Sequence, residues 1–159
     1  MIKKARGMKR TPFSKKHKVV HKVEDPNAEE KLALISKAAR LRGRIFKGLH
    51  CAMCTEENWD LPTVPHHILN KGRYNHLRFV MMNLIPLCVH HHDYAHGEQT
   101  SFLLDLLDNY PRHYREYLNE RDNRKPIKQT VKSLTFIVED LQYYVENPGI
   151  AEQVIYEKE

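Results

Sequence analysis

Hydrophobic residues recur at helical spacing in two stretches of the chain, and short apolar runs lie between these stretches. Spacings of three and four residues predict one helix over residues 27–46. Further helices are predicted over residues 102–107, from Pro111 to about Asn123, and from Pro126 to residue 147. The apolar positions of these helices are Leu32, Ile35, Ala38, Ala39, Phe102, Leu103, Leu106, Leu107, Val131, Leu134, Ile137, Val138, Leu141 and Val145.

Two short apolar runs, residues 64–68 and residues 83–87, predict β-strands. Each run contains proline, which cannot donate to a strand ladder, so both strands should lie at a sheet edge. The pattern becomes helical again from Val89. We therefore expect an α+β fold, with a small core built around two strands, flanking α-helices and a mostly helical C-terminal half.

Positive charge is concentrated at the N-terminus. Residues 1–22 contain nine Lys and Arg and no acidic residue, whereas the whole chain of 159 residues has a net charge of +6. The remainder is therefore slightly acidic. We expect residues 1–26 to form a flexible basic arm, residues 27–100 a core with its preceding helix, residues 101–147 helices that pack on this core, and residues 148–159 a loose tail.

The composition also restricts the cellular setting. No apolar run is long enough to span a membrane, and no apolar stretch follows the basic N-terminus as it would in a secretory signal. Three cysteines, an odd and small number, argue against a disulfide framework. We expect a cytoplasmic protein without a membrane partner.

Cysteine and histidine gather in one segment. All three cysteines and eight of the eleven histidines lie within residues 50–96. Two pairs, Cys51-x-x-Cys54 and Cys88-x-x-His91, have the spacing at which a tight turn directs both side chains to one tetrahedral ion. The pattern predicts a structural zinc site, and the alternative is a set of reduced cysteines in a core.

A second cluster lies between and just after these pairs. His92 and His96 are spaced i, i+4 at the start of a predicted helix, so their rings share one face. His66 and His67 are adjacent on a predicted strand and should point to opposite sides. Only one of the two can then join an ion that His92 and His96 face, which leaves the other for proton transfer. The alternative is a solvated histidine tract that binds metal adventitiously.

Three motifs occur in a fixed order over residues 44–97. They are Cys51-x-x-Cys54, then Val64-Pro65-His66-His67-Ile68, then Asn83-Leu84-Ile85-Pro86-Leu87-Cys88-x-x-His91-His92-x-x-x-His96. In order, spacing and residue type this segment resembles the HNH (ββα-metal) endonucleases. It departs from their usual pattern at His91, where most zinc-bearing members have cysteine, and at His66, where many have aspartate.

The resemblance implies a zinc-stabilised ββα-metal core that hydrolyses DNA phosphodiester bonds. His66, His92 and His96 would hold a divalent catalytic ion, which could be Mg²⁺, Mn²⁺, Ni²⁺ or Zn²⁺. The all-histidine set favours a borderline transition metal over an obligate Mg²⁺. His67 would be the general base that takes a proton from the attacking water. Asn83 would hold the hairpin loop, and thereby His67, through side-chain hydrogen bonds.

Basic residues outside the arm are candidates for contact with DNA phosphates. Without a base-reading helix, recognition should be weakly sequence-specific or directed by DNA structure. The layout is similar to that of phage recombination or junction nucleases of the NinG/Rap kind, for which branched DNA would be a substrate and the host cytoplasm the location. The candidate contacts are Arg40, Arg42, Arg44, Lys47, Lys71, Arg73 and Arg78.

Two other classes of function stay open. One is a zinc-stabilised DNA-binding module without catalysis, although a complete set of ligands together with His67 argues against it. The other is an adaptor whose C-terminal helices dimerise or dock on a larger enzyme. The oligomeric state is open, with a dimer through these helices as one option.

Overall fold

The computed structural model describes residues 25–122 and 128–157, and the predicted basic arm falls almost entirely outside them. The described chain is α+β and mostly helical, with a single two-stranded sheet. In the described ranges no helix has the length and apolar character needed to cross a membrane. The elements are α1 (Ala28–Phe46), η1 (Glu56–Asn58), β1 (Thr63–His67), η2 (Asn75–Leu77), η3 (Met81–Asn83), β2 (Leu84–Cys88), α2 (Val89–Gly97), α3 (Gln99–Asn109), α4 (Pro111–Arg121), α5 (Val131–Glu146) and α6 (Pro148–Tyr156).

The sheet is an antiparallel pair of β1 and β2, as the two apolar runs predicted. His66 lies opposite Ile85 and His67 opposite Leu84. Each strand is displaced by one residue from its predicted range. The pairing nevertheless continues beyond β1, because the Ile68 amide donates to the Asn83 carbonyl at 3.0 Å.

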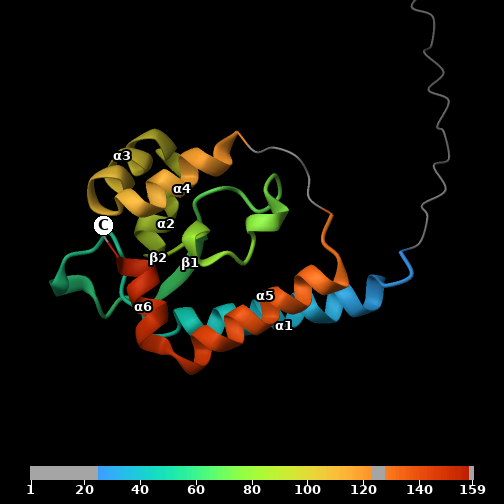
Figure 1. Cartoon of the computed structure of the whole chain (residues 1–159). Helices are drawn as coiled ribbons and strands as arrows, with labels where there is room; N and C mark the ends of the chain where they lie inside the picture. Colours follow the sequence, from blue (N-terminus) through green and yellow to red (C-terminus); the bar gives the residue numbers. More distant parts are fainter. Residues whose placement is uncertain (1–24, 123–127, 158–159) are drawn as a thin grey trace, which may run out of the picture.

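Two groups of helices enclose this hairpin. Figure 1 shows α1 and α5 side by side on one side, and α2, α3 and α4 together on the other. All five residues of β2 are buried between them. Leu84 packs with the core of α1, α5 and α6, whereas Ile85 and Leu87 pack with Phe102 and Leu106 of α3. Because successive side chains of β2 point to opposite faces, this strand contributes to both hydrophobic clusters and connects them.

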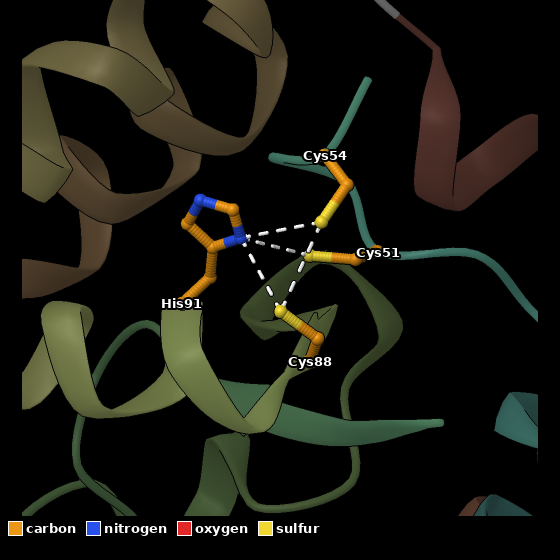
Figure 2. Close-up of side chains that lie close together, drawn as sticks. All are labelled: Cys51, Cys54, Cys88 and His91. Atoms are coloured by element: carbon orange, nitrogen blue, oxygen red, sulfur yellow. Dashed lines mark hydrogen bonds between the residues drawn. The ribbon is translucent and has the colours of Figure 1, made fainter. Parts of the chain in front are cut away.

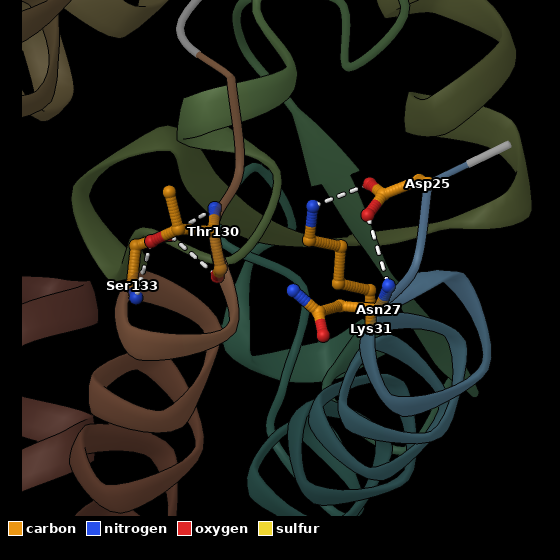
Figure 3. A network of polar contacts seen from close by, with 5 residues as sticks. All are labelled: Asp25, Asn27, Lys31, Thr130 and Ser133. Carbon is orange, nitrogen blue, oxygen red and sulfur yellow. Dashed lines mark hydrogen bonds and ion pairs between the residues drawn. The ribbon is translucent and has the colours of Figure 1, made fainter. Parts of the chain in front are cut away.

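Local hydrogen bonds mark where α1 and α5 begin (Figure 3). Asp25 accepts from the Asn27 amide at 3.0 Å and from Lys31 Nζ at 2.5 Å. Thr130 and Ser133 form a reciprocal capping box, each side chain accepting from the other's backbone amide. The helix predicted from Pro126 therefore starts at Val131, and residues 123–127 lie outside the described chain.

The expectation of a loose tail over residues 148–159 is wrong for its described part. Pro148–Tyr156 is helical, and its Ala151 and Ile155 are 2% and 0% exposed in the core of α1 and α5. The Tyr156 hydroxyl donates to the His50 carbonyl at 2.6 Å. Tertiary packing and this anchor stabilise a helix that is too short to persist alone.

The buried face of α1 also differs from the predicted one at its first turn. Leu32 is 64% exposed, whereas Ala38, Leu41 and Ile45 are buried. Partly buried contacts with the core begin at Leu34. The core therefore starts two residues, or about half a turn, later than the apolar pattern suggests.

Candidate metal centres

Three cysteines and one histidine converge from two segments of the chain (Figure 2). Cys51 and Cys54 lie in the turn that follows α1, closed by a Cys54 amide to Cys51 carbonyl bond of 3.2 Å. Cys88 is the last residue of β2, and His91 lies in the first turn of α2. The bond from the Ala52 amide to the Pro86 carbonyl, 2.9 Å, holds the turn against the strand.

The spacing of the ligand atoms matches a tetrahedral ion. In a tetrahedral zinc site, bond lengths of about 2.3 Å to sulfur and about 2.0 Å to nitrogen separate two sulfurs by about 3.8 Å and sulfur from nitrogen by about 3.5 Å. The Sγ atoms of Cys54 and Cys88 are 3.8 Å apart. His91 Nδ1 lies 3.4, 3.5 and 3.4 Å from the sulfurs of Cys51, Cys54 and Cys88. This Cys₃His cluster could therefore hold a metal such as zinc.

The thiols of this cluster differ in their affinity for protons. Burial, together with hydrogen bonding and charge from Cys51 and Cys88, raises the pKa of Cys54 to about 12. Burial would also raise the pKa of Cys88, but hydrogen bonds, including those from the His91 and His90 amides, outweigh it and lower that pKa. Amides at the start of a helix stabilise a thiolate in this way, so α2 favours the ligand form of Cys88.

A second cluster contains only histidines. His66 on β1 lies with its ring centroid 5.1 Å from that of His92 and 5.0 Å from that of His96, both on α2. One ligand atom from each of the three lies within 4.8 Å of the others. His66 Nδ1 is buried and has no hydrogen-bond partner, an arrangement that is costly unless a ligand or ion satisfies the atom. The set fits a cation that three side chains hold and that keeps free positions.

The environment keeps His66 in the form that can bind metal. Burial, followed by the neighbouring His92, His96 and His67, lowers the pKa of His66 to about 3. Burial and His96 likewise lower the pKa of His92. Both rings are therefore neutral at physiological pH, which leaves a nitrogen lone pair for coordination.

His67 points away from the three-histidine cluster, as alternation along a strand predicted. Its Nε2 lies 3.1 Å from the Arg78 carbonyl and 3.3 Å from Arg42 Nη1. Burial, and then the charges of Arg42, Lys71 and Arg78, lower its pKa to about 4, against the opposing effect of the carbonyl. A carbonyl only accepts, so the closer contact assigns the hydrogen to Nε2 and the lone pair to Nδ1.

Asn83 makes the loop contacts expected of it. Its Oδ1 accepts from the Leu69 amide at 2.7 Å, and its Nδ2 donates to the carbonyls of Leu69 and Leu77 at 3.1 and 3.2 Å. The side chain is 4% exposed. Asn83 thus fixes the end of β1, where His66 and His67 lie, without facing solvent.

The three histidines and His67 line one cavity of about 850 Å³. Of the predicted DNA contacts, Arg42, Lys71 and Arg73 also line it, whereas Arg40, Arg44 and Lys47 are exposed elsewhere. Arg121 at the end of α4 lines it too, which the sequence analysis missed. The Tyr74 hydroxyl donates to the Arg121 carbonyl at 2.6 Å and so ties α4 to the loop before η2. The described lining includes no Asp or Glu.

A comparison of the chain with models of protein families, with curated proteins and with solved structures gave no match. The site must therefore be interpreted from its own chemistry.

Proposed function

We propose that this chain is a metal-dependent endonuclease of the HNH type that hydrolyses phosphodiester bonds of DNA. The observation that supports this most strongly is the shared cavity. It combines three convergent histidines, an adjacent fourth histidine whose pKa is lowered to about 4, and four Lys or Arg side chains, with no Asp or Glu in its described lining. Structural zinc sites do not need such surroundings, whereas a polyanionic substrate does.

In this proposal each histidine has a distinct task. His66, His92 and His96 would hold a divalent cation, and its chemistry there would be to neutralise negative charge on the phosphodiester as it is cleaved. His67 accepts at Nδ1 the proton of the water that attacks phosphorus, while its Nε2–H remains bonded to the Arg78 carbonyl. Asn83 keeps this end of the strand in place. A neutral imidazole is ready for the task at physiological pH, because the pKa of His67 is lowered to about 4.

The Cys₃His cluster is proposed to have a structural role. Its four ligands close a tetrahedron, so the metal would stabilise the turn, β2 and α2 rather than bind substrate. Because α2 also carries His92 and His96, this cluster would fix the position of the catalytic ligands.

The substrate is proposed to be DNA recognised by its backbone or its branched shape. Four cations line the cavity, and Lys and Arg side chains contact phosphates of either strand without reading the base sequence. Phage-type recombination or junction cleavage is the particular process that the layout favours.

The test is plasmid cleavage by the purified chain with Mg²⁺, Mn²⁺, Ni²⁺ or Zn²⁺, using supercoiled, linear and branched DNA. His67→Ala should retain the fold and DNA binding but lose about 10²- to 10⁴-fold in rate, as expected on removal of a general base. His90→Ala is the matched control, since this exposed histidine of α2 belongs to neither cluster. Equal rates for both variants would exclude His67 as the base. DNA binding without cleavage in any metal would favour a non-catalytic zinc-stabilised module.

A further inference from the structure

Two arginines beside His67 lack an acidic partner. The guanidinium carbons of Arg42 on α1 and Arg78 after η2 lie 5.7 and 5.3 Å from the ring centroid of Phe79. The Nε atoms of both arginines are buried and have no hydrogen-bond partner. Within residues 25–122 and 128–157, neither guanidinium lies within ion-pair distance of a carboxylate.

This arrangement is costly for the free protein. A guanidinium has five donors and does not give up its charge in proteins, so each buried Nε–H without an acceptor loses hydration that nothing replaces. Burial, and then the positive charge of Arg78, lower the pKa of Arg42. Such a pair is stabilised when an anion lies between or beside its members.

Neighbouring side chains hold the two guanidinium groups in an orientation that suits an anion. Phe79 is 1% exposed and offers its ring to both guanidiniums, which limits their rotation. Both arginines are only half-buried, and of their side-chain nitrogens only Nε is buried without a partner. Because each side chain is only half-buried, a ligand can reach it from solvent. Arg42 lines the cavity that also holds the histidines.

We propose that Arg42 and Arg78 together form a binding site for one phosphate group, next to His67. Paired guanidiniums match the size and charge of a tetrahedral oxyanion and offer several donors in a fixed arrangement. The inference rests on the proposed function in one respect, namely that the natural phosphate is a backbone phosphodiester of DNA. The site would hold this group against the cavity while His67 acts on water.

The first experiment measures phosphate binding in the absence of cleavage. The zinc-loaded protein is titrated with inorganic phosphate, and the arginine Nε–H signals are followed by NMR. The signals of Arg42 and Arg78 should shift along one saturation curve. Arg78→Gln should weaken phosphate binding about 10- to 100-fold, as expected for loss of a charged hydrogen bond. The substitution leaves in place the backbone carbonyl of Arg78 that His67 contacts, and it removes a charge that lowers the pKa of His67, so phosphate binding rather than cleavage is the first readout.

Lys37→Gln is the matched control, because it removes the same charge from an exposed position of α1 outside the cavity. Arg78→Lys keeps the charge but not the planar fork, and should give intermediate binding. Thermal unfolding and zinc content of every variant establish that the fold is intact. Independent shifts of the two signals, or equal binding by Arg78→Gln and Lys37→Gln, would overturn the paired site.

A second experiment separates this inference from the proposed function. Cleavage of a short DNA duplex is measured at increasing substrate concentration. Arg78→Gln should raise KM about tenfold or more with a smaller change in kcat. Phosphate binding at the pair without cleavage in any metal would reject the nuclease and retain the site. Cleavage with unchanged KM in Arg78→Gln would retain the nuclease and reject the site.

Discussion

The two candidate metal centres use neighbouring residues of the same helix yet differ in what they can do. His91 and His92 are about 100° apart around the axis of α2, so one faces the cysteines and the other faces His66. The first centre has four ligands, three of them sulfur, with Cys51 and Cys88 buried. The second has three nitrogen ligands, and its His96 is exposed. Ligand number and openness, rather than position along the helix, distinguish the proposed structural centre from the proposed reactive one.

The cavities beside the two centres reinforce this difference. Their volumes are similar, about 790 Å³ beside the cysteines and about 850 Å³ beside the histidines. The first is lined by aromatic side chains such as Trp59 and Tyr156, with Asp105 and without Lys or Arg among its described lining. The second has four cations and no acid there. Size alone does not distinguish the cavities, but the charge of their linings does, and the proposed polyanionic substrate matches the lining of the second.

Among changes to the ligands of the two centres, the largest effect on cleavage is expected when one ligand of the three-histidine centre is removed. His92→Ala should lower DNA cleavage about a hundredfold or more, as does the loss of other preorganised charge stabilisation. Its thermal stability and the zinc held by the cysteines should change little, because His92 lies outside the Cys₃His set. Elemental analysis, unfolding and cleavage are measured on the same preparation. Loss of the sulfur-bound zinc in this variant would show that the two centres are not independent.

Removal of a ligand from the Cys₃His centre should instead lower the stability of the fold, and any loss of cleavage should follow from that. Structural zinc supplies about 10 kcal/mol or more of folding free energy in small metal domains, so Cys88→Ser should cost several kcal/mol. Urea unfolding with and without chelator measures the effect. In wild-type protein, chelation should reduce stability strongly, and in Cys88→Ser it should have little further effect. A variant as stable as wild type, with a normal metal content, would contradict the structural role.

Much of the difference between the two centres could be predicted from the sequence, because each ligand set depends on the spacing of nearby residues. Two residues between ligands define each half of the Cys₃His centre, and the i, i+4 spacing of His92 and His96 defines a helix face. Alternation on a strand predicted that His66 and His67 diverge, and the structure confirms it. Alternation alone could not tell which of the two faces α2, since that depends on how the hairpin packs.

Features that depend on packing between distant segments of the chain could not be predicted in this way. Arg121 reaches the cavity only because the Tyr74 hydroxyl and the loop before η2 pack on the end of α4. The helix α6 had a signal in the spacing of Ala151 and Ile155, but an opening Pro-Gly pair and the short length obscured it. Its stability comes from α1 and α5, which no local pattern encodes.

A smaller effect is expected from pH, and it should arise mainly on the histidine side. The pKa of His67 is about 4 in the folded protein and about 6.5 in an unfolded chain, so the unfolded state binds this proton first on acidification. The stabilisation is complete above about pH 6.5 and is lost as pH falls from there toward 4.

His67→Gln should therefore reduce the slope of unfolding free energy against pH in this window. The reduction is at most about 1.4 kcal/mol per pH unit, and less to the extent that solvent screens the half-buried ring. A cation held nearby acts in the same direction. Urea unfolding between pH 4.5 and 7 is the measurement, with His90→Gln as the control. Equal slopes for the two variants would mean that His67 is not held neutral by the fold.

The smallest effect should come from a single cavity cation. Lys71 is exposed at the rim of the histidine cavity, and a single phosphate contact contributes about 0.9 to the slope of log K against log salt. Lys71→Gln should therefore reduce the loss of DNA affinity between 50 and 200 mM salt by about threefold. Lys132→Gln removes the same charge from an exposed position of α5 outside both cavities and should leave the slope unchanged. Fluorescence anisotropy with a short duplex measures both slopes. Equal changes in the two variants would mean that DNA binding depends on the overall charge of the protein and not on contacts at the histidine cavity.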